Sequence, residues 1–297
     1  MKGKIGFIGV GTMGKPMALN LMKAGYELAV YDINPKPLKE LQEKGATIGQ
    51  SIRDVAGKSP VVITMVPNSK DVEDVILKEN GAIEGLKSGS VVIDMSTIDP
   101  GVSRKISKIL REKNIQMLDA PVSGGQTGAE AATLAIMVGG EEEVFKKCLP
   151  ILKAMGKNVS YCGPSGNGEI VKIINNLMAG VFRVASAEAL ALGVKAGVPL
   201  KILYDVINES SGQSRTVQVS AAGKPFKGDY EPGFAAELMH KDLGLALNLG
   251  KEERVPLPLG ALSHQIYTHL LSLGLGKKDT GVIFKVMEDL LGIQIRL

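Results

Sequence analysis

The feature that most constrains this 297-residue chain is a glycine-rich turn near its start, GFIGVGTMGKPMA. Gly9, Gly11 and Gly14 form a G-x-G-x-x-G pattern that follows an apolar run and opens a helical one. Gly9 permits a tight turn, Gly11 lets the backbone approach a pyrophosphate, and Gly14 permits close packing of helix on strand. The pattern predicts a dinucleotide site, and a plain strand–helix turn is the alternative. The predicted cofactor-binding residues of the turn are Gly9, Val10, Gly11, Thr12, Met13 and Gly14.

Asp32 supports the dinucleotide prediction. It ends the next apolar run, ELAVYD, about 20 residues after the glycines. A carboxylate at this place accepts hydrogen bonds from the ribose hydroxyls of NAD and repels the 2′-phosphate of NADP. The INPKP stretch that follows holds no arginine, although Lys36 weakens the preference. We therefore expect NAD rather than NADP, and a surface aspartate is the alternative.

Strand-like and helix-like segments alternate over residues 1–163. The strand candidates are nearly all apolar, as expected for a parallel sheet that is covered on both faces. They are KIGFIGV, ELAVYD, PVVITMV, SVVIDMS, IQMLDAP, TLAIMVGG and NVSYCG. This alternation predicts an α/β, Rossmann-like, doubly wound sheet.

After about residue 164 the strand signal ends. The stretch from Gly166 to Gly197 predicts one long helix, closed by Gly197 and Pro199. Further helices are predicted near 199–209, 234–250, 256–274 and 279–291. The sequence thus predicts a dinucleotide-binding domain over 1–163 and an all-α substrate and oligomerisation domain over 164–297, joined by a long interdomain helix.

Composition excludes several other functions. The net charge of +4 is spread without a basic run and Trp is absent, so we expect no nucleic-acid partner. The two cysteines and three histidines show no metal-ligand spacing, so we expect no metal and a reducing, cytoplasmic location. No uninterrupted apolar run reaches about 18 residues, so we expect no membrane span.

Two later strand ends are candidates for the same cofactor site. Val66 and Pro67 follow one apolar run, and Ser96 and Thr97 follow another. In doubly wound sheets, ligands lie beyond the carboxyl ends of the strands. A strand-terminating proline and a helix N-cap explain these residues equally well.

A second glycine loop, DAPVSGG, follows a further strand candidate. Ser123, Gly124 and Gly125 offer a hydroxyl and successive unhindered N–H groups, an arrangement that binds a carboxylate. A flexible turn before a helix is the alternative.

Polar residues interrupt the start of the long helix, in EIVKIINNLMAG. Lys172 and Asn176 share a helix face, Asn175 flanks it, and the preceding GPSGNG is expected to keep the helix start small and open to a ligand. Lys172 can extend to solvent, pair with Glu169, or act as a general acid/base between the domains. Hydride transfer involving an alcohol needs a proton acceptor. With no His, Tyr-x-x-x-Lys pair or metal site evident, Lys172 is the best-placed candidate.

Four segments in order resemble one family, the β-hydroxyacid dehydrogenases. They are GFIGVGTMGKPMA, DAPVSGG, GPSGNGEIVKIINN and GFAAELMHKDLGLAL, spanning residues 6–247. The resemblance implies reversible, NAD-dependent oxidation of a small β- or ω-hydroxy acid to its semialdehyde, as with 3-hydroxyisobutyrate or 2-(hydroxymethyl)glutarate. An NADPH-linked tartronate or succinic semialdehyde reductase, and a non-catalytic dinucleotide-binding module, are the alternatives.

The resemblance also implies roles for single residues. Lys172 matches the catalytic lysine, Asn176 matches the substrate-binding asparagine that acts with it, and Arg215 either meets a second substrate carboxylate or belongs to a capped turn. The implied substrate carboxylate site is Ser123, Gly124 and Gly125, with Lys241 near both substrate and cofactor. Further implied cofactor contacts are Thr97 and Phe234. Family habit implies a homodimer or homotetramer.

Overall fold

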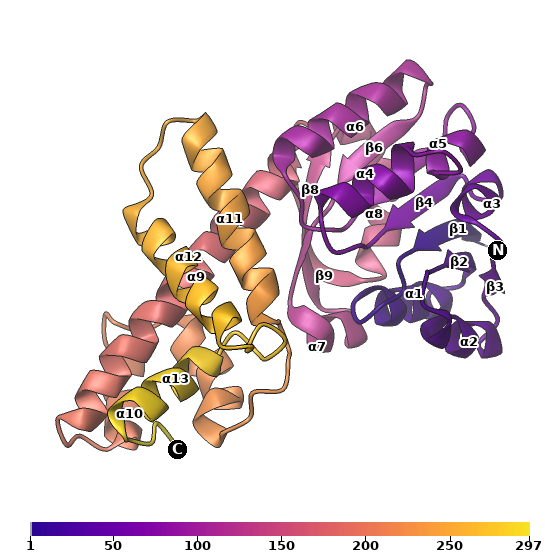
Figure 1. The fold of residues 1–297 in the computed structure, drawn as a ribbon. Helices are drawn as coiled ribbons and strands as arrows, with labels where there is room; N and C mark the ends of the chain where they lie inside the picture. Colours follow the sequence, from indigo (N-terminus) through magenta and orange to yellow (C-terminus); the bar gives the residue numbers. More distant parts are fainter. Residues whose placement is uncertain (1) are drawn as a thin grey trace. The chain divides into compact units, whose positions relative to one another are not determined.

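The computed structural model describes residues 2–297, and the chain divides into two compact units, Met1–Lys172 and Ile173–Leu297 (Figure 1). The first unit contains a sheet with helices, and the second is built from helices. The predicted domain boundary after residue 163 stays a prediction, since the long helix crosses the division between the two units.

A nine-stranded sheet forms the centre of the first unit, in the order β3-β2-β1-β4-β5-β6-β8-β7, with β9 paired to β8. Its strands are β1 Lys2–Ile8, β2 Tyr26–Tyr31, β3 Thr47–Ile48, β4 Val61–Thr64, β5 Val91–Asp94, β6 Gln116–Asp119, β7 Val122–Ser123, β8 Leu134–Gly140 and β9 Gly156–Gly163. The pairs from β3 to β6 are parallel, which confirms the predicted Rossmann-like architecture. The prediction missed the antiparallel pairing of β8 with β6 and β7, and the two-residue strands β3 and β7. A two-residue strand is too short for an alternating pattern to reveal.

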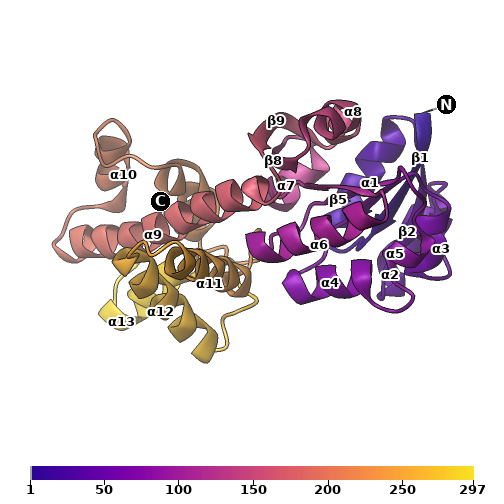
Figure 2. The same cartoon turned by 90° about the horizontal axis from the view of Figure 1, so that it is seen from above.

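Helices cover both faces of this sheet (Figures 1 and 2). Consecutive residues Val62 and Ile63 of β4 belong to different hydrophobic clusters, because neighbouring side chains of a strand point to opposite faces. Helices α1 Gly14–Lys23, α2 Pro35–Glu43, α7 Gly125–Glu130 and α8 Glu142–Lys153 contribute to the cluster that contains Ile63. Helices α3 Ile52–Gly57, α4 Ser69–Leu77, α5 Ala82–Gly85 and α6 Pro100–Glu112 contribute to the clusters on the opposite face. Burial on both faces explains why the strand runs are almost wholly apolar.

The second unit contains the predicted helices and two short elements that the sequence did not reveal. Its elements are α9 Asn167–Lys195, which starts in the first unit, α10 Leu200–Asn208, the π-helix η1 Thr216–Ala221, the 3-10 helix η2 Pro225–Lys227, α11 Ala236–Glu252, α12 Pro258–Ser272 and α13 Val282–Leu291. The core includes Phe226 and Phe284, which meet edge to face with their ring centroids 5.4 Å apart. The unit therefore has a hydrophobic core of its own.

Helix α9 is long and apolar enough to cross a membrane, judged by length and composition alone. Only 28% of its most apolar window is buried. The sequence predicted this helix but found no uninterrupted apolar run in it, because polar residues such as Lys172 interrupt the run; the absence of a membrane span stays a prediction. Core helices of soluble proteins pass the same test, so the signal is weak.

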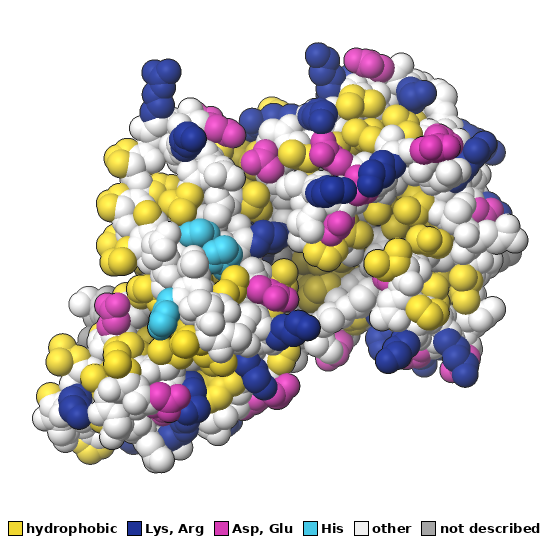
Figure 3. All heavy atoms as spheres, in the orientation of Figure 1, with side chains coloured by type: hydrophobic (Ala, Val, Ile, Leu, Met, Phe, Trp, Pro, Cys, Tyr) yellow, Lys and Arg dark blue, Asp and Glu magenta, His cyan; other side chains and the backbone are white. Residues whose placement is uncertain are grey.

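The surface carries both signs of charge. In Figure 3, basic and acidic side chains are interspersed over the visible face, with apolar side chains between them. No large field of one sign forms on this face, and the absence of a nucleic-acid partner stays a prediction.

Candidate functional site

The three glycines of the first turn meet different surroundings. Gly9 has φ +89°, and a Cβ there would lie 2.3 Å from the Met65 carbonyl oxygen. A Cβ on Gly14 would lie 1.9 Å from the Gly9 carbonyl oxygen, whereas a Cβ on Gly11 would meet no atom within 4 Å. Gly9 and Gly14 are therefore required by the fold. Gly11 faces open space, as a backbone that a pyrophosphate approaches must do.

Helix α1 begins directly after this turn. The Lys15 N–H donates to the Gly11 carbonyl at 3.0 Å, so the helical bonds start within the glycine pattern. No acidic residue lies in the first turn of α1, and Lys15 pairs with Glu40 at 2.7 Å. The positive end of the helix dipole is thus not offset by a carboxylate within its own first turn, which suits a bound phosphate.

Asp32 follows β2 and faces the glycine turn. One carboxylate oxygen accepts the Val10 N–H at 2.7 Å, and the other accepts the Asn34 N–H at 2.7 Å. These two bonds fix the orientation of the carboxylate, and each oxygen has a further lone pair that can accept a ribose hydroxyl. The residues present therefore fit a dinucleotide.

The ends of β4 and β5 are tied to the same turn by a relay of hydrogen bonds. A Cβ on Gly9 would lie 3.0 Å from Val66 Cγ1, and the Val66 N–H donates to Ser96 Oγ at 3.0 Å. Ser96 Oγ in turn donates to Asp94 Oδ1 at 2.7 Å, which also accepts the Thr64 hydroxyl at 2.8 Å. The structure thus brings the glycine turn, Val66 and Ser96 together, and a role of these strand ends in cofactor binding stays a prediction.

Asp94 was missed by the sequence prediction. It is fully buried, and burial raises its pKa to about 6, although the hydrogen bonds from Ser96 and Thr64 act against this shift. The negative charge of nearby Asp119, whose own pKa is raised by burial, adds to the shift of Asp94. An acid that ends an apolar run, as in VVID and QMLD, is the signal that could have revealed both residues.

Asp119 holds the start of α9 against the sheet. Its carboxylate accepts the Gly166 N–H at 2.7 Å and the Glu169 N–H at 3.3 Å. A Cβ on Gly168 would lie 2.4 Å from the Met137 carbonyl oxygen. The prediction that small residues keep this helix start open to a ligand is therefore wrong at Gly168, where smallness permits close packing on the sheet.

The second glycine loop depends on conformations that favour glycine. Ser123 ends β7, and Gly124 and Gly125 follow with φ of +138° and +62°. The helix that they open, α7, packs on α1, because Asn20 Nδ2 donates to the Ala129 carbonyl at 2.6 Å. The two glycine loops are thus followed by helices in mutual contact. The carboxylate-binding role of Ser123, Gly124 and Gly125 stays a prediction.

Lys172 lies on a buried face of α9. It is 6% exposed, and Glu169 and Asn176 on the same face are 0% and 4% exposed. Such burial excludes the alternative in which the Lys172 amine extends into bulk water. Glu169 Oε2 accepts the Ile98 N–H at 3.1 Å, which ties this helix face to the residue after Thr97.

In the second unit, Asp242 joins two of the predicted residues. Asn176 Nδ2 donates to Asp242 Oδ2 at 2.5 Å, and Lys241 Nζ lies 3.2 Å from Asp242 Oδ1. Asp242 is buried, so these contacts orient both side chains in a medium of low dielectric constant. The sequence did not reveal the role of Asp242. A charged residue within an otherwise apolar helix face was the available signal.

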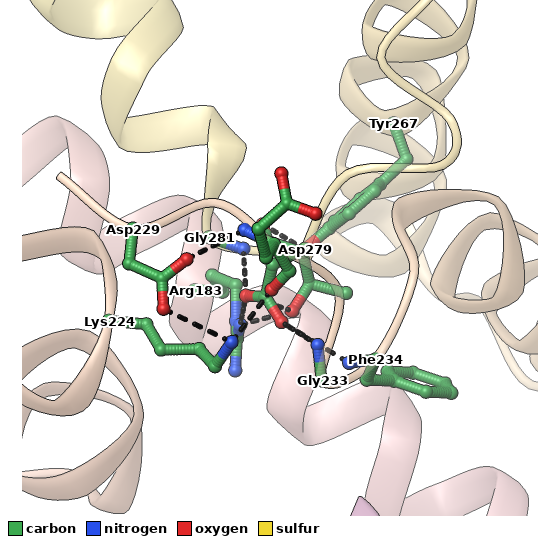
Figure 4. Close-up of polar contacts among 10 residues, drawn as sticks. Arg183, Lys224, Asp229, Gly233, Phe234, Tyr267, Asp279 and Gly281 are labelled. Carbon is green, nitrogen blue, oxygen red and sulfur yellow. Dashed lines mark hydrogen bonds and ion pairs between the residues drawn. The ribbon is translucent and has the colours of Figure 1, made fainter. Parts of the chain in front are cut away.

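Phe234 lies in the segment before α11, and a buried aspartate holds that segment (Figure 4). The Gly233 and Phe234 N–H groups donate to Asp279 Oδ2 at 3.0 and 3.2 Å. Arg215, whose role the sequence left open, is exposed at the N-terminus of the π-helix η1. The structure gives Arg215 no role.

Residues 2–297 contain no metal cluster, and a cavity that they form lies apart from both glycine loops. Within residues 2–297, no group of three or more His, Cys, Asp or Glu side chains is placed to hold a metal ion. A cavity of about 300 Å³ lies at the ends of α6 and β9, lined among others by Arg111, Glu141 and Tyr161. None of its lining residues belongs to either glycine loop.

Two family profiles match the chain. The profile described as the NAD binding domain of 6-phosphogluconate dehydrogenase matches residues 4–163. The profile described as NAD-binding of NADP-dependent 3-hydroxyisobutyrate dehydrogenase matches residues 166–287. Together they cover nearly the whole chain.

Individual proteins match over their full length. The chain is 42% identical over 292 residues to the 2-(hydroxymethyl)glutarate dehydrogenase of Eubacterium barkeri, covering 98% of this chain and 97% of that one. It is 40% identical over 295 residues to the NAD-dependent L-serine dehydrogenase of Pseudomonas aeruginosa, covering 97% and 99%. A solved 3-hydroxyisobutyrate dehydrogenase of Mycobacterium tuberculosis with L-serine has a TM-score of 0.87 at 31% identity, covering 97% and 99%.

Proposed function

Because the chain belongs to the β-hydroxyacid dehydrogenase family, we propose that it oxidises a small β-hydroxy carboxylic acid with Lys172 as the general acid/base. Membership makes the chain an NAD-dependent oxidoreductase that acts on the CH–OH group of a hydroxy acid. The observation that carries the residue-level proposal is the burial of Lys172 on one helix face with Asn176. A buried amine beside a buried amide is shielded from bulk water, and this position suits transfer of a proton to or from a bound substrate.

The cofactor site of this proposal is the glycine turn and the strand ends around it. The N–H groups at the start of α1 bind the pyrophosphate, and the Asp32 carboxylate accepts hydrogen bonds from the ribose hydroxyls. The remaining proposed contacts with NAD are Val66, Pro67, Thr97, Phe234 and Lys241. When bound, NAD supplies the hydride acceptor.

The substrate of this proposal is held by its carboxylate. Ser123 donates its hydroxyl, and Gly124 and Gly125 donate their backbone N–H groups, to the carboxylate oxygens. Asn176 orients the substrate hydroxyl toward Lys172 Nζ, and Lys241 adds a positive charge for the anion. The hydroxyl proton passes to Lys172 as the C–H bond breaks and the carbonyl forms. In the reverse direction Lys172 returns the proton to the carbonyl oxygen.

The substitution Lys172→Ala tests the assignment. Loss of the proton acceptor should lower kcat by about 10²–10⁴-fold, while the dissociation constant for NADH stays within about threefold of the wild type. The measurement is steady-state turnover followed by NADH absorbance, together with NADH binding by fluorescence. The matched control is Lys195→Ala on the same helix, because Lys195 is exposed and contacts the Leu291 carbonyl.

A Lys172→Ala variant that turns over at nearly the wild-type rate would remove Lys172 from the mechanism. A turnover screen of 3-hydroxyisobutyrate, 2-(hydroxymethyl)glutarate and L-serine with NAD and NADP identifies the substrate. Strong NADP preference, or activity only as a semialdehyde reductase, would favour the reductase alternative.

The proposal includes a homodimer or homotetramer and a cytoplasmic location. Helix α9 carries apolar side chains three or four residues apart that remain exposed, so they form one stripe along the helix. They are Val171, Ile174, Met178 and Phe182. Contact with a second copy would remove this stripe from water. Cys148 and Cys162 are both free, which suits a reducing compartment.

A further inference from the structure

Asp279 is a buried carboxylate whose contacts all lie within the second unit (Figure 4). Its Oδ2 accepts the Gly233 N–H at 3.0 Å and the Phe234 N–H at 3.2 Å. Its Oδ1 accepts the Gly281 N–H at 2.8 Å and lies 3.6 Å from Arg183 Nη1 of α9. One carboxylate therefore fixes two consecutive N–H groups of the segment that carries Phe234.

The two chain neighbours of Asp279 also hold the backbone around Phe234. The Thr280 N–H donates to the Phe234 carbonyl at 2.9 Å, and the Ala236 N–H donates to the Lys278 carbonyl at 2.8 Å. With the bonds to Asp279, both the N–H and the carbonyl of Phe234 are satisfied. A phenylalanine held in this way loses backbone freedom before any ligand arrives, so less entropy is lost on binding.

The ion pair with Arg183 explains why a charge is tolerated at this place. The side chains of Arg183 and Asp279 are 11% and 9% exposed. Arg183 also donates to the hydroxyl of Thr280, the neighbour of Asp279. On the other side of the segment, Lys224 Nζ donates to the Glu231 carbonyl at 2.8 Å and pairs with Asp229 at 3.3 Å, but this contact is more exposed and contributes less.

We propose that Asp279, held by Arg183, is a positioning residue for Phe234: its carboxylate fixes the backbone that presents the phenyl ring to the nicotinamide. The inference rests on the proposed function, in which Phe234 contacts the cofactor. Asp279 itself touches neither substrate nor cofactor. Its effect on catalysis therefore depends on the Phe234 ring.

A double-mutant cycle of Asp279→Asn and Phe234→Ala tests this dependence. Asp279→Asn should raise KM for NAD by about tenfold and change kcat by less than about twofold, because charge-assisted bonds to two N–H groups are weakened. In the Phe234→Ala background, the same substitution should change KM by less than about twofold. Hydrogen exchange of residues 230–236 should speed up in Asp279→Asn.

Two further variants distinguish a loss of Phe234 positioning from a general loss of stability. Arg183→Met combined with Asp279→Asn removes both buried charges, so it avoids the unpaired guanidinium that can prevent Asp279→Asn from folding, and it should show the same KM effect. Glu288→Gln removes another buried carboxylate of this unit, one that pairs with Arg296. It should lower thermal stability without changing KM for NAD.

Additive effects of Asp279→Asn and Phe234→Ala on KM would show that Asp279 stabilises the unit without positioning Phe234, and would overturn the inference. Unchanged exchange of residues 230–236 in the folded variants would do the same. The proposed function is tested separately, by the turnover rate of the Lys172→Ala variant.

Discussion

At the scale of single residues, the glycine turn separates packing from ligand approach. A Cβ at Gly14 would overlap the Gly9 carbonyl, whereas a Cβ at Gly11 would meet open space. The two positions belong to one motif, but the fold needs one of them and only the ligand needs the other. The sequence pattern alone does not distinguish these roles.

Gly11→Ala and Gly14→Ala should therefore fail in different ways. The free energy of unfolding of Gly11→Ala should stay within about 1 kcal/mol of the wild-type value. The variant should bind NADH about tenfold more weakly, since its methyl group occupies the space of the pyrophosphate. Gly14→Ala should lose about 3 kcal/mol of unfolding free energy, because its Cβ would lie 1.9 Å from a carbonyl oxygen.

Urea unfolding and NADH titration of both glycine variants measure the two effects, and each variant serves as the control for the other. Equal loss of stability in the two variants would contradict the distinction between packing and ligand approach.

At the scale of elements, the ends of β4 and β5 are joined through one buried acid. Asp94 ends β5, accepts hydrogen bonds from Thr64 and Ser96, and through Ser96 supports the N–H of Val66. Since burial raises the pKa of Asp94 to about 6, the folded state favours its neutral form. The stabilisation from this preference is fully present below the ordinary pKa of 3.8 and is lost as the pH rises toward 6.

Asp94→Asn stays neutral at every pH, so its stability relative to the wild type should increase between pH 4 and pH 7. The gain should be about 3 kcal/mol, from roughly two pKa units. Urea unfolding at the two pH values measures it. The control is Ser107→Ala, which changes no titratable group. Its free energy of unfolding should differ from that of the wild type by the same amount at both pH values. A pH-independent difference for Asp94→Asn would show that burial does not raise the pKa of Asp94.

At the scale of the whole molecule, α9 has more apolar surface than one chain buries. Met178, in the middle of its exposed stripe, is 51% exposed. An exposed stripe of this kind is typical of an interaction surface.

Light scattering should give a wild-type mass of two or four chains, and Met178→Glu should lower it by placing a charge in the interface. Val255→Glu is the matched control, because Val255 is similarly exposed but lies outside α9. A wild-type mass of one chain, or an unchanged assembly in Met178→Glu, would contradict the proposed interface.

The whole-molecule architecture was largely predictable. The Rossmann-like sheet and the helices after residue 199 followed from local periodicity, and the comparisons confirm the family and the NAD-dependent chemistry. The edge of the sheet was not predictable in the same way. Pairing direction at β8 depends on how distant strands meet, which an apolar run does not encode.

By itself, the sequence determined the glycine turn, the place of Asp32 after the next strand, and the helix face that Lys172 and Asn176 share, because each follows from local spacing. The burial of that face was decided by the tertiary structure. Only the tertiary structure decided which buried acids hold the segments that carry the predicted site residues. Asp94, Asp242 and Asp279 accept hydrogen bonds from residues 30, 66 and 46 positions away. The physical reason is that burial makes a carboxylate costly unless donors surround it, and the fold alone brings those donors to it.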